Sequence, residues 1–289
     1  LEMFFFFFIL TDPIPDFSNL PLLEKLHFHT NRITVTLTNF SKLPKLRELS
    51  IFNNQLDSLP PLTFFKQSGQ AFNLLELEGN RFTFDDLLPN LVNGLTRTPT
   101  ATLRYAPQDS VGQAATRNLA AGQNLDLDLG IDKGVPDNRY EWFKNGQALT
   151  PVIVGTPRLR INVVSVSDAG LYHCRITNPR LPDLTLFSRG IRVNVNCSAV
   201  NVNISGSSTF CAGSSTTLTA SGGTNYSWST GATTAQITAT AAGTYTVTAT
   251  NAGGCTGTAT LSVSQSNALT PNISGSSTFC AGSSTTLTA

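Results

Sequence analysis

The sequence predicts a mainly β protein, in which a short solenoid of stacked repeats is followed by β-sandwich domains. Three observations carry the prediction. An eleven-residue pattern of apolar positions recurs three times within residues 23–82. Further on, two segments each place a Trp ahead of an Ala-Gly-x-Tyr sequence and alternate apolar with polar residues, as half-buried strands do. Finally, all 19 Lys and Arg and all 18 Asp and Glu lie before residue 196, so the composition changes sharply there.

The solenoid is predicted from the pattern L-x-x-L-x-L-x-x-N-x-L, whose copies cover residues 23–33, 46–56 and 72–82. Alternate side chains of a strand point to opposite faces, so the L-x-L core sends its leucines inward and the residues between them outward. One copy cannot bury its own apolar face, so neighbours must stack. The pattern resembles that of leucine-rich-repeat proteins, which implies a sheet with an outer, concave face.

The Asn of each copy stands where the chain turns away from the strand. A buried amide at that position can satisfy backbone groups that the turn leaves unpaired. A weaker fourth copy at residues 103–108 keeps the spacing with Gln in place of Asn, and its Tyr-Ala-Pro-Gln end is expected to close the solenoid. Before it, residues 85–93 are expected to form a short helix with an acidic pair at its N-terminus. The three Asn residues are Asn31, Asn54 and Asn80.

The concave face is the best candidate for ligand binding, because the register places mixed polar and aromatic side chains on it. Phe52 is expected to be exposed among polar residues. The alternative is an ordinary solvated face, or one that a neighbouring domain covers. The rows expected side by side are Lys25, Glu48, Leu74 and Thr102; His27, Ser50, Glu76 and Arg104; and His29, Phe52, Glu78 and Ala106. The candidate ligand-binding residues are Lys25, His27, His29, Glu48, Ser50, Phe52, Glu76, Glu78 and Arg104.

Catalytic and metal-binding constellations are not found in the sequence. There is no Gly-x-Ser-x-Gly elbow, no H-E-x-x-H and no Walker motif. His27 and His29 are spaced as a pair of metal ligands could be, but no Cys lies near them and the glutamates are two strands away. The outward pair Asp126 and Asp128 is better explained as solvated surface than as a weak Ca²⁺ site. We therefore expect no enzyme activity, metal or cofactor.

Residues 111–195 predict the first sandwich. They contain alternating Leu and Asp at 125–129, then Trp142, then the sequence D-x-G-x-Y-x-C ending at Cys174. These motifs resemble an immunoglobulin-like domain, which implies a core Trp and a hydrogen-bonded corner at Tyr172. The first Cys of the usual inter-sheet disulfide falls on Leu129. Cys174 is therefore expected to be a buried small hydrophobe beside Trp142, without a disulfide partner.

Residues 196–266 are rich in Ser, Thr and Gly, and one interpretation is a disordered stalk. A β-branched alternating strand within 238–250, a core-type Trp228 and the corner sequence before Tyr245 favour a second, smaller sandwich instead. Cys211 and Cys255 are expected to form its disulfide, which implies an oxidising compartment. Cys197 has no counterpart in the repeat and is left unassigned.

The two ends of the chain predict that it is part of a longer protein. Residues 203–220 recur identically as 272–289, so residues 267–289 are expected to start a further repeat. The apolar run at residues 3–10 is too short to span a bilayer and lacks the flanks of a signal peptide. Its interpretations are the edge of a preceding repeat, a sequence error or a damaged secretion signal. No transmembrane span is predicted.

A wider resemblance rests on Thr-Phe-Cys-Ala-Gly at 209–213, Tyr-Ser-Trp-Ser-Thr-Gly at 226–231, Gly-Thr-Tyr-Thr-Val at 243–247 and Gly-Cys-Thr-Gly at 254–257. These sequences are similar to the tandem Ig-like or PKD-like repeats of bacterial secreted and surface proteins. The resemblance implies an extracellular or cell-surface location and a protein or glycan ligand. The expected domains are 1–11, unassigned; 12–110, solenoid with cap; 111–195, Ig-like domain; 196–266, Ig-like or PKD-like repeat; and 267–289, start of the next repeat.

The predicted function is extracellular binding or adhesion through the concave face, with the sandwiches as spacers. A structural surface stalk and an accessory region of a secreted polysaccharide-degrading enzyme are the alternatives. The formal net charge of +1 gives no electrostatic case for a nucleic-acid partner.

Overall fold

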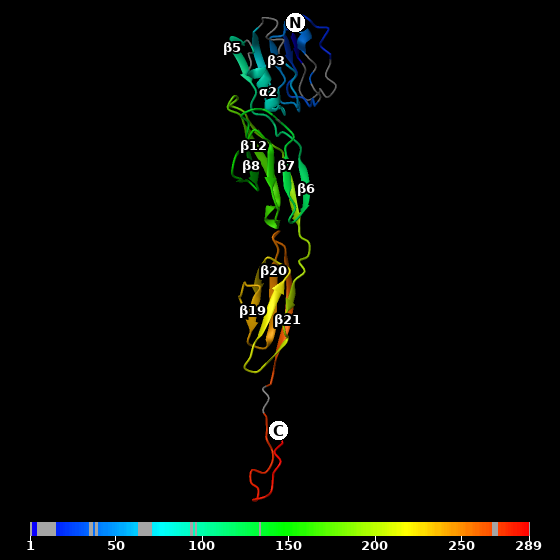
Figure 1. Ribbon diagram of the computed structural model, residues 1–289. Coiled ribbons are helices and arrows are strands. Elements are labelled where there is room, and N and C mark those ends of the chain that lie inside the picture. The colour runs from blue at the N-terminus through cyan, green and yellow to red at the C-terminus, as the bar shows by residue number, and fades with distance from the viewer. Residues whose placement is uncertain are drawn as a thin grey trace. The chain divides into compact units, whose positions relative to one another are not determined.

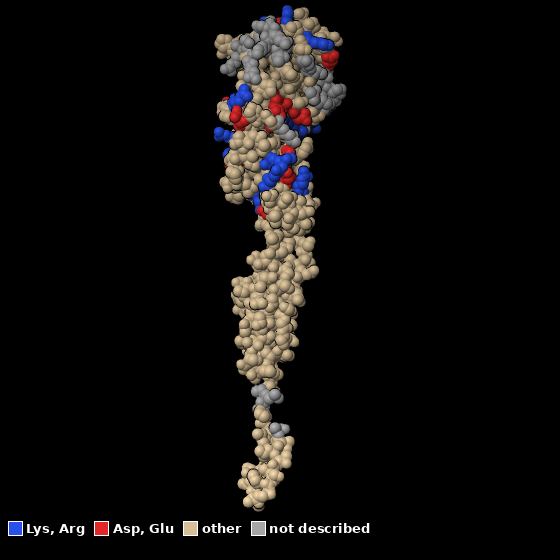
Figure 2. Space-filling model, in the orientation of Figure 1, with Lys and Arg blue, Asp and Glu red and all other residues tan. Residues whose placement is uncertain are grey.

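The computed structural model describes residues 2–4, 16–34, 37, 40–62, 71–92, 95, 97–132, 134–267 and 271–288. The chain forms two compact units (Figure 1). The first covers most residues up to Asn196, and the second covers most residues from Cys197 onward. Charged side chains lie on the first unit, whereas the second is free of them (Figure 2).

The first unit begins with a five-stranded sheet in which all neighbouring strands are parallel and follow the chain order. The inward leucines of successive copies pair directly, Leu26 with Leu49 and Leu49 with Leu75, and each is fully buried. The predicted inward register of the L-x-L core is confirmed. The strands are β1 (Glu2–Phe4), β2 (Lys25–His27), β3 (Glu48–Ser50), β4 (Phe72–Glu76) and β5 (Arg97–Arg104).

Strand β1 helps to interpret the apolar run at the start of the chain. Glu2 pairs with Lys25, the same spacing of 23 residues that separates the first two repeats. Residues 2–4 therefore occupy the place of a preceding repeat strand, one of the interpretations of this run. Residues 5–10 lie outside the described part of the chain.

The Asn residues of the repeats form a ladder of buried amides, as predicted. The amide of Asn80 donates to the carbonyls of Leu77 and Ile51, 3.1 and 2.9 Å away, and so joins its own repeat to the one before. Its oxygen accepts the backbone N–H of Leu56 at 3.2 Å. Gln108 takes the same role one repeat later, donating to the Leu77 carbonyl at 3.0 Å. The longer Gln side chain thus replaces Asn at the end of the stack.

Two short helices lie among the repeats: the 3-10 helix η1 (Phe40–Lys42) and the α-helix α2 (Phe84–Leu91). The helix expected at residues 85–93 is therefore confirmed, one residue earlier at its start. The Asp86 carboxylate accepts the N–H and the hydroxyl of Thr83, at 2.8 and 3.0 Å, and caps the first turn. Phe84 and Leu87 are fully buried, so the helix covers the core.

The rest of the first unit is a β-sandwich. One sheet has the order β10-β8-β12-β14-β6, with β13 beside β12 and β9 beside β8; the other contains β7 and β11. Trp142 and Tyr172 are buried at its centre, and the Tyr172 hydroxyl donates to the Asp168 carbonyl at 2.7 Å. The expected corner is therefore present. The strands are β6 (Ala115–Ala120), β7 (Leu125–Asp128), β8 (Arg139–Lys144), β9 (Gln147–Ala148), β10 (Ile153–Val154), β11 (Arg158–Ile161), β12 (Gly170–Thr177), β13 (Thr185–Phe187) and β14 (Ile191–Asn196), with a 3-10 helix η2 (Val166–Asp168).

Cys174 lies where the sequence placed it. It is fully buried, forms no disulfide and pairs across the sheet with Trp142. Burial raises the pKa of its thiol to about 12, so the group stays protonated. Leu129, at the position of the usual partner Cys, follows strand β7 and packs partly buried against the same core.

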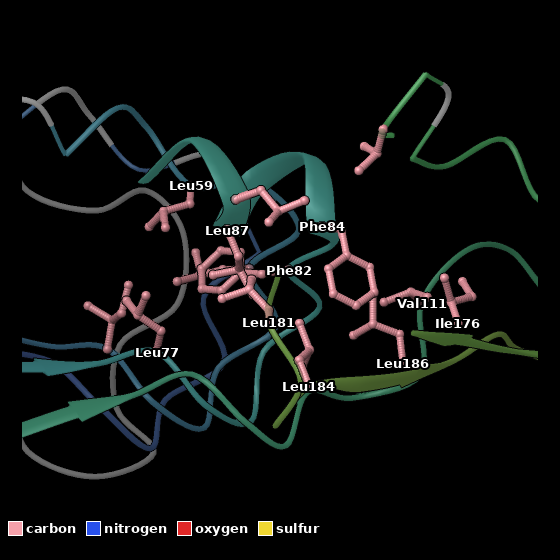
Figure 3. Close-up of a cluster of buried hydrophobic side chains, with 14 of the residues drawn as sticks. Leu59, Leu77, Phe82, Phe84, Leu87, Val111, Ile176, Leu181, Leu184 and Leu186 are labelled. Carbon is pink, nitrogen blue, oxygen red and sulfur yellow. The ribbon is translucent and has the colours of Figure 1, made fainter. Parts of the chain in front are cut away.

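The repeats and this sandwich share one hydrophobic core (Figure 3). Phe84 of α2 faces Val111 and Leu186, while Leu181 reaches toward Phe82. Val111, at the start of the sandwich, is held to it by backbone bonds: its N–H donates to the Phe187 carbonyl and its carbonyl accepts from the Arg189 N–H, both at 2.9 Å. The contact is a continuous apolar interface.

One polar contact stands inside this interface. Asp132, only 1% exposed, accepts the backbone N–H of Asp85 at 2.8 Å, in the first turn of α2. Burial raises the pKa of Asp132 to about 6, although the bonds from Asp85 and Thr83 oppose that shift. Asp85 and Asp86 lie in the first turn of the helix, as predicted, and the backbone N–H of Asp85 also binds a carboxylate 47 residues away.

The second unit is a smaller sandwich and not a disordered stalk. Its sheets have the orders β15-β17-β19 and β16-β21-β20-β18. Trp228 is 3% exposed, and the Tyr245 hydroxyl donates to the Ala241 carbonyl at 2.9 Å, so the corner recurs as predicted. The strands are β15 (Asn203–Ser205), β16 (Thr209–Cys211), β17 (Thr216–Ser221), β18 (Asn225–Trp228), β19 (Gln236–Ala239), β20 (Gly243–Thr250) and β21 (Thr256–Ser266).

The predicted Cys211–Cys255 disulfide is wrong. Cys255 is bonded to Cys197, and Cys211 is a free, exposed thiol. The reason is the direction of β21: Cys211 pairs with Ser266 at the far end of that strand, whereas Cys255 directly precedes its first residue. Eleven residues of extended strand separate the two cysteines by roughly 35 Å.

Residues 271–288 contain one isolated bridge, between Ser274 and Thr288. It repeats, 69 residues later, the pairing of Ser205 with Thr219 in the complete sandwich. The local pairing agrees with the start of a further repeat, which stays a prediction.

Candidate binding face of the parallel sheet

The predicted rows of outward side chains are brought together by the strand register. Glu48 pairs with Lys25 and Leu74, and Ser50 pairs with His27 and Glu76. The last row continues past the strand ends through backbone bonds from Thr30 to Phe52 and from Asn53 to Glu78, at 2.8 and 2.9 Å. Six of the nine candidate residues therefore lie in the strands of one sheet, and His29, Phe52 and Glu78 lie just past the strand ends. Their role in binding stays a prediction.

The first row of this face contains paired acidic and basic side chains. Glu48 lies 3.5 Å from His27 and 3.8 Å from Lys25, measured to the closest side-chain nitrogens. Lys25 also meets Glu2 of β1 at 2.7 Å, a contact that the sequence did not suggest. The Glu2 carboxylate raises the pKa of Lys25, which keeps its charge. These side chains neutralise one another at the edge of the face.

In the second row, Ser50 lies beneath Glu76 and holds it in place. Ser50 is 1% exposed and donates its hydroxyl to Glu76 at 2.7 Å. Ser50 was expected to contact a ligand, and its burial corrects that expectation: it positions Glu76 instead. Arg104, whose side chain is 60% exposed, reaches Glu76 at 3.4 Å and Glu78 at 3.9 Å. Arg104 is therefore an accessible cation beside two half-buried carboxylates.

The third row has an aromatic pair at its start. The rings of His29 and Phe52 stack with centroids 4.3 Å apart and an interplanar angle of 6°. Phe52 is partly buried, so the expectation that it is exposed is correct only in part. Burial lowers the pKa of His29, and His27 lowers it further, so at pH 7 the stacked imidazole is neutral.

Glu78 completes the third row. Its side chain is 16% exposed, and its Oε2 is buried without a hydrogen-bond donor in the described part of the chain. Burial raises the pKa of this carboxyl, the nearby Glu76 adds to the effect, and Arg104 acts against it. An acceptor desolvated in this way gains most from a donor brought by a partner.

No group of three or more His, Cys, Asp or Glu in the described residues is arranged to hold a metal ion. In the same residues, no helix has the length and hydropathy that a membrane crossing requires.

Comparison with known families identifies the repeats. The family model of leucine-rich repeats, in two copies, matches residues 12–63, which contain the first two copies of the pattern. The chain thus contains leucine-rich repeats. No curated protein matches the chain.

Several solved structures are similar to parts of the chain. The amphioxus IgVJ-C2 molecule is 17% identical, with 50% of this chain and 98% of that one covered and a TM-score of 0.27. Drosophila OTK extracellular domains 3–5 are 15% identical, covering 53% and 64%, with a TM-score of 0.27. Three N-terminal domains of the bacteriophage RB49 outer capsid protein Hoc are 22% identical, covering 52% and 56%, with a TM-score of 0.25. TM-scores this low do not establish a shared fold, so the Ig-like description rests on the strands and corners above.

Proposed function

We propose that the chain is an extracellular binding or adhesion protein whose leucine-rich repeats form a short solenoid and recognise a protein partner on the concave face. The single observation that carries the proposal is the buried, unbonded Oε2 of Glu78, in the same row of the face as Phe52. A glycan is the second class of ligand that a polar and aromatic face can accept.

The chemistry of this row favours a cationic side chain from the partner. A Lys or Arg would donate to Glu78 and lie against the face of Phe52, combining a charge-assisted hydrogen bond with a cation–π contact. The hydrogen bond from Ser50 holds Glu76 in place, so this carboxylate is positioned before the partner binds. Arg104 would be displaced from Glu78 or would bind an acidic group of the same partner.

The remaining parts fit the role of spacers in an exported protein. The Cys197–Cys255 disulfide is stable in oxidising compartments outside the cytosol. We propose the boundaries 12–110, 111–195, 196–266 and 267–289 for the successive domains, and a bacterial surface protein with Ig-like or PKD-like repeats as the setting.

The test is a binding screen of the full chain against an array of host-surface proteins and a glycan array. A Phe52→Ala, Glu78→Gln double variant is the probe of the face, and Glu24→Gln, an exposed carboxylate just before β2, is the matched control. We expect to find a ligand whose affinity for the double variant is at least tenfold lower than for the parent protein. Its affinity for the control variant should equal that for the parent. A ligand that binds all three alike would place recognition elsewhere.

A structural stalk is the second candidate, and the charge-free surface of the second unit favours it (Figure 2). Absence of any ligand for the folded full chain would support the stalk, or an accessory region of a secreted polysaccharide-degrading enzyme, and reject the adhesion proposal.

A further inference from the structure

The first sandwich has an open edge at strand β11. This strand pairs with β7 on one side, and no other strand of the described chain pairs with it. The N–H of Leu129 donates to Pro157, so the hydrogen-bonded pairs run through residues 157, 159 and 161. In an antiparallel ladder the residues between them turn their backbone groups away from the partner strand. The N–H and C=O groups of Arg158 and Arg160 therefore point along the free edge.

A cleft lies beside this edge. Its volume is about 810 Å³, and it opens between β11 and the segment from Leu149 to Pro157. Its lining includes Trp142, Leu149, Ile153 and Leu159, so most of the wall is apolar. The Trp142 indole N–H is buried and has no acceptor among the described residues. Such a donor leaves a hydrogen bond unmade that a bound molecule can complete.

The outer face of the same strand is charged. Arg158 contacts Asp126 and Asp128, each at 3.2 Å, and Arg160 contacts Asp126 through its Nε at 3.2 Å. The Arg160 side chain is 63% exposed, which leaves its guanidinium accessible to a further carboxylate. Leu159 therefore contributes to the apolar wall of the cleft, whereas Arg158 and Arg160, which border the same cleft, make its edge basic.

We propose that this edge is a peptide-binding site, in which an extended peptide adds to β11 as a third strand. Its backbone bonds to the outward groups of Arg158 and Arg160. Alternate side chains enter the cleft, and one of them offers an acceptor to Trp142. The side chains between them are acidic and face Arg160. This site lies on a different domain from the proposed concave face and does not depend on that proposal.

The geometry favours a peptide over other occupants. Outward backbone groups two residues apart repeat every 6–7 Å, roughly the spacing that another strand matches and a sugar does not. A second copy of this chain, joined antiparallel through its own β11, would bring arginines opposite arginines, and like charges across a strand pair are destabilising.

The test uses the full chain and the blocked heptapeptide Glu-Val-Glu-Thr-Glu-Val-Glu as the probe, in which Thr provides the acceptor. Three relatives serve as controls: the peptide with Val for Thr, the peptide with Lys for every Glu, and the peptide N-methylated at alternate residues. Binding is followed by titration in ¹H–¹⁵N NMR spectra. We expect slowed exchange of the Arg158 and Arg160 amides and a shift of the Trp142 indole signal. We expect the Lys and N-methylated peptides to bind at least tenfold more weakly.

Three variants make the proposal falsifiable. Arg160→Pro removes an outward N–H, which an edge strand tolerates, and should abolish binding while the thermal midpoint shows a folded protein. Arg160→Lys keeps the backbone group and should bind within a few-fold of the parent. Trp142→Phe should erase the advantage of the Thr peptide over the Val peptide. Equal binding to Arg160→Pro, or no binding of any peptide by the folded parent, overturns the proposal.

Discussion

The buried carboxyl of Asp132 gives the sharpest test of the interface between the repeats and the first sandwich. Asp132 is 1% exposed, and burial raises its pKa from 3.8 to about 6. A pKa raised in the folded state means that, between roughly pH 4 and 6, the folded protein holds a proton that the unfolded chain has released. Stability contributed by this group therefore falls as the pH rises through that window. Above that pH window the carboxyl is ionised in the folded protein, and the full free-energy cost of burying its charge lowers the stability.

The size of the effect follows from the pKa shift. About two units correspond to a cost of roughly 3 kcal/mol at pH 7, since one unit is about 1.4 kcal/mol. Asp132→Asn removes the charge and retains an oxygen that can accept the N–H of Asp85. Asn also tolerates the left-handed φ of 51° at this position. We therefore expect the variant to be more stable than the parent by 2–3 kcal/mol, roughly, at pH 7, and equal to it near pH 3.5.

The assay is urea unfolding of the full chain with Trp228 replaced by Phe, repeated from pH 3.5 to 7.5, so that the fluorescence reports Trp142 of the first unit. Asp137→Asn is the matched control, because Asp137 also has a positive φ, of 66°, but is exposed. The control should leave the dependence of stability on pH unchanged. A stability difference between Asp132→Asn and the parent that stays constant across the pH range would refute the argument, as would a variant that is less stable at pH 7.

Three further outcomes follow from the packing. Asn54→Ala removes two bonds to the carbonyls of Phe28 and Ile51 and leaves the buried N–H of Ile33 without its acceptor. It should lower the free energy of unfolding by about 1–3 kcal/mol in urea titrations, and an unchanged stability would contradict the ladder. Cys255→Ser opens the disulfide-closed loop, whose cysteines are 58 residues apart, and should lower the stability of the second unit by about 4 kcal/mol. Cys211→Ser should have no effect, and peptide mapping that finds a disulfide at Cys211 would contradict this. Tyr245→Phe removes the corner bond and should cost about 1 kcal/mol by thermal unfolding, against no loss if the corner is incidental.

Local patterns predicted much of the fold. The eleven-residue repeat gave the strand register, because the inward and outward positions of a strand follow from its period of two. Gln108 was identified as the counterpart of Asn80 by spacing alone, and both amides bond to the Leu77 carbonyl. The corner tyrosines were predicted from the resemblance to immunoglobulin-like domains, and their bonds reach only four residues back along the chain.

The candidate site was predicted less completely. The register identified the face, yet it could not indicate that Ser50 is buried beneath Glu76 or that the rings of His29 and Phe52 stack. Both depend on side-chain packing between neighbouring repeats. The repeat symmetry also misled the disulfide prediction, because Cys197 has no counterpart 69 residues later, where Ser266 stands.

The sequence by itself determined the repeats, their inward leucines, the amide ladder and the two corner tyrosines. All of these depend on spacing within one repeat or one turn, and a sequence states spacing directly. Only the tertiary structure decided the Cys197–Cys255 bond, the burial of Asp132 against α2 and the open edge of β11. Each of these depends on which distant segments lie side by side, and that is set by the packing of whole sheets and not by any local pattern.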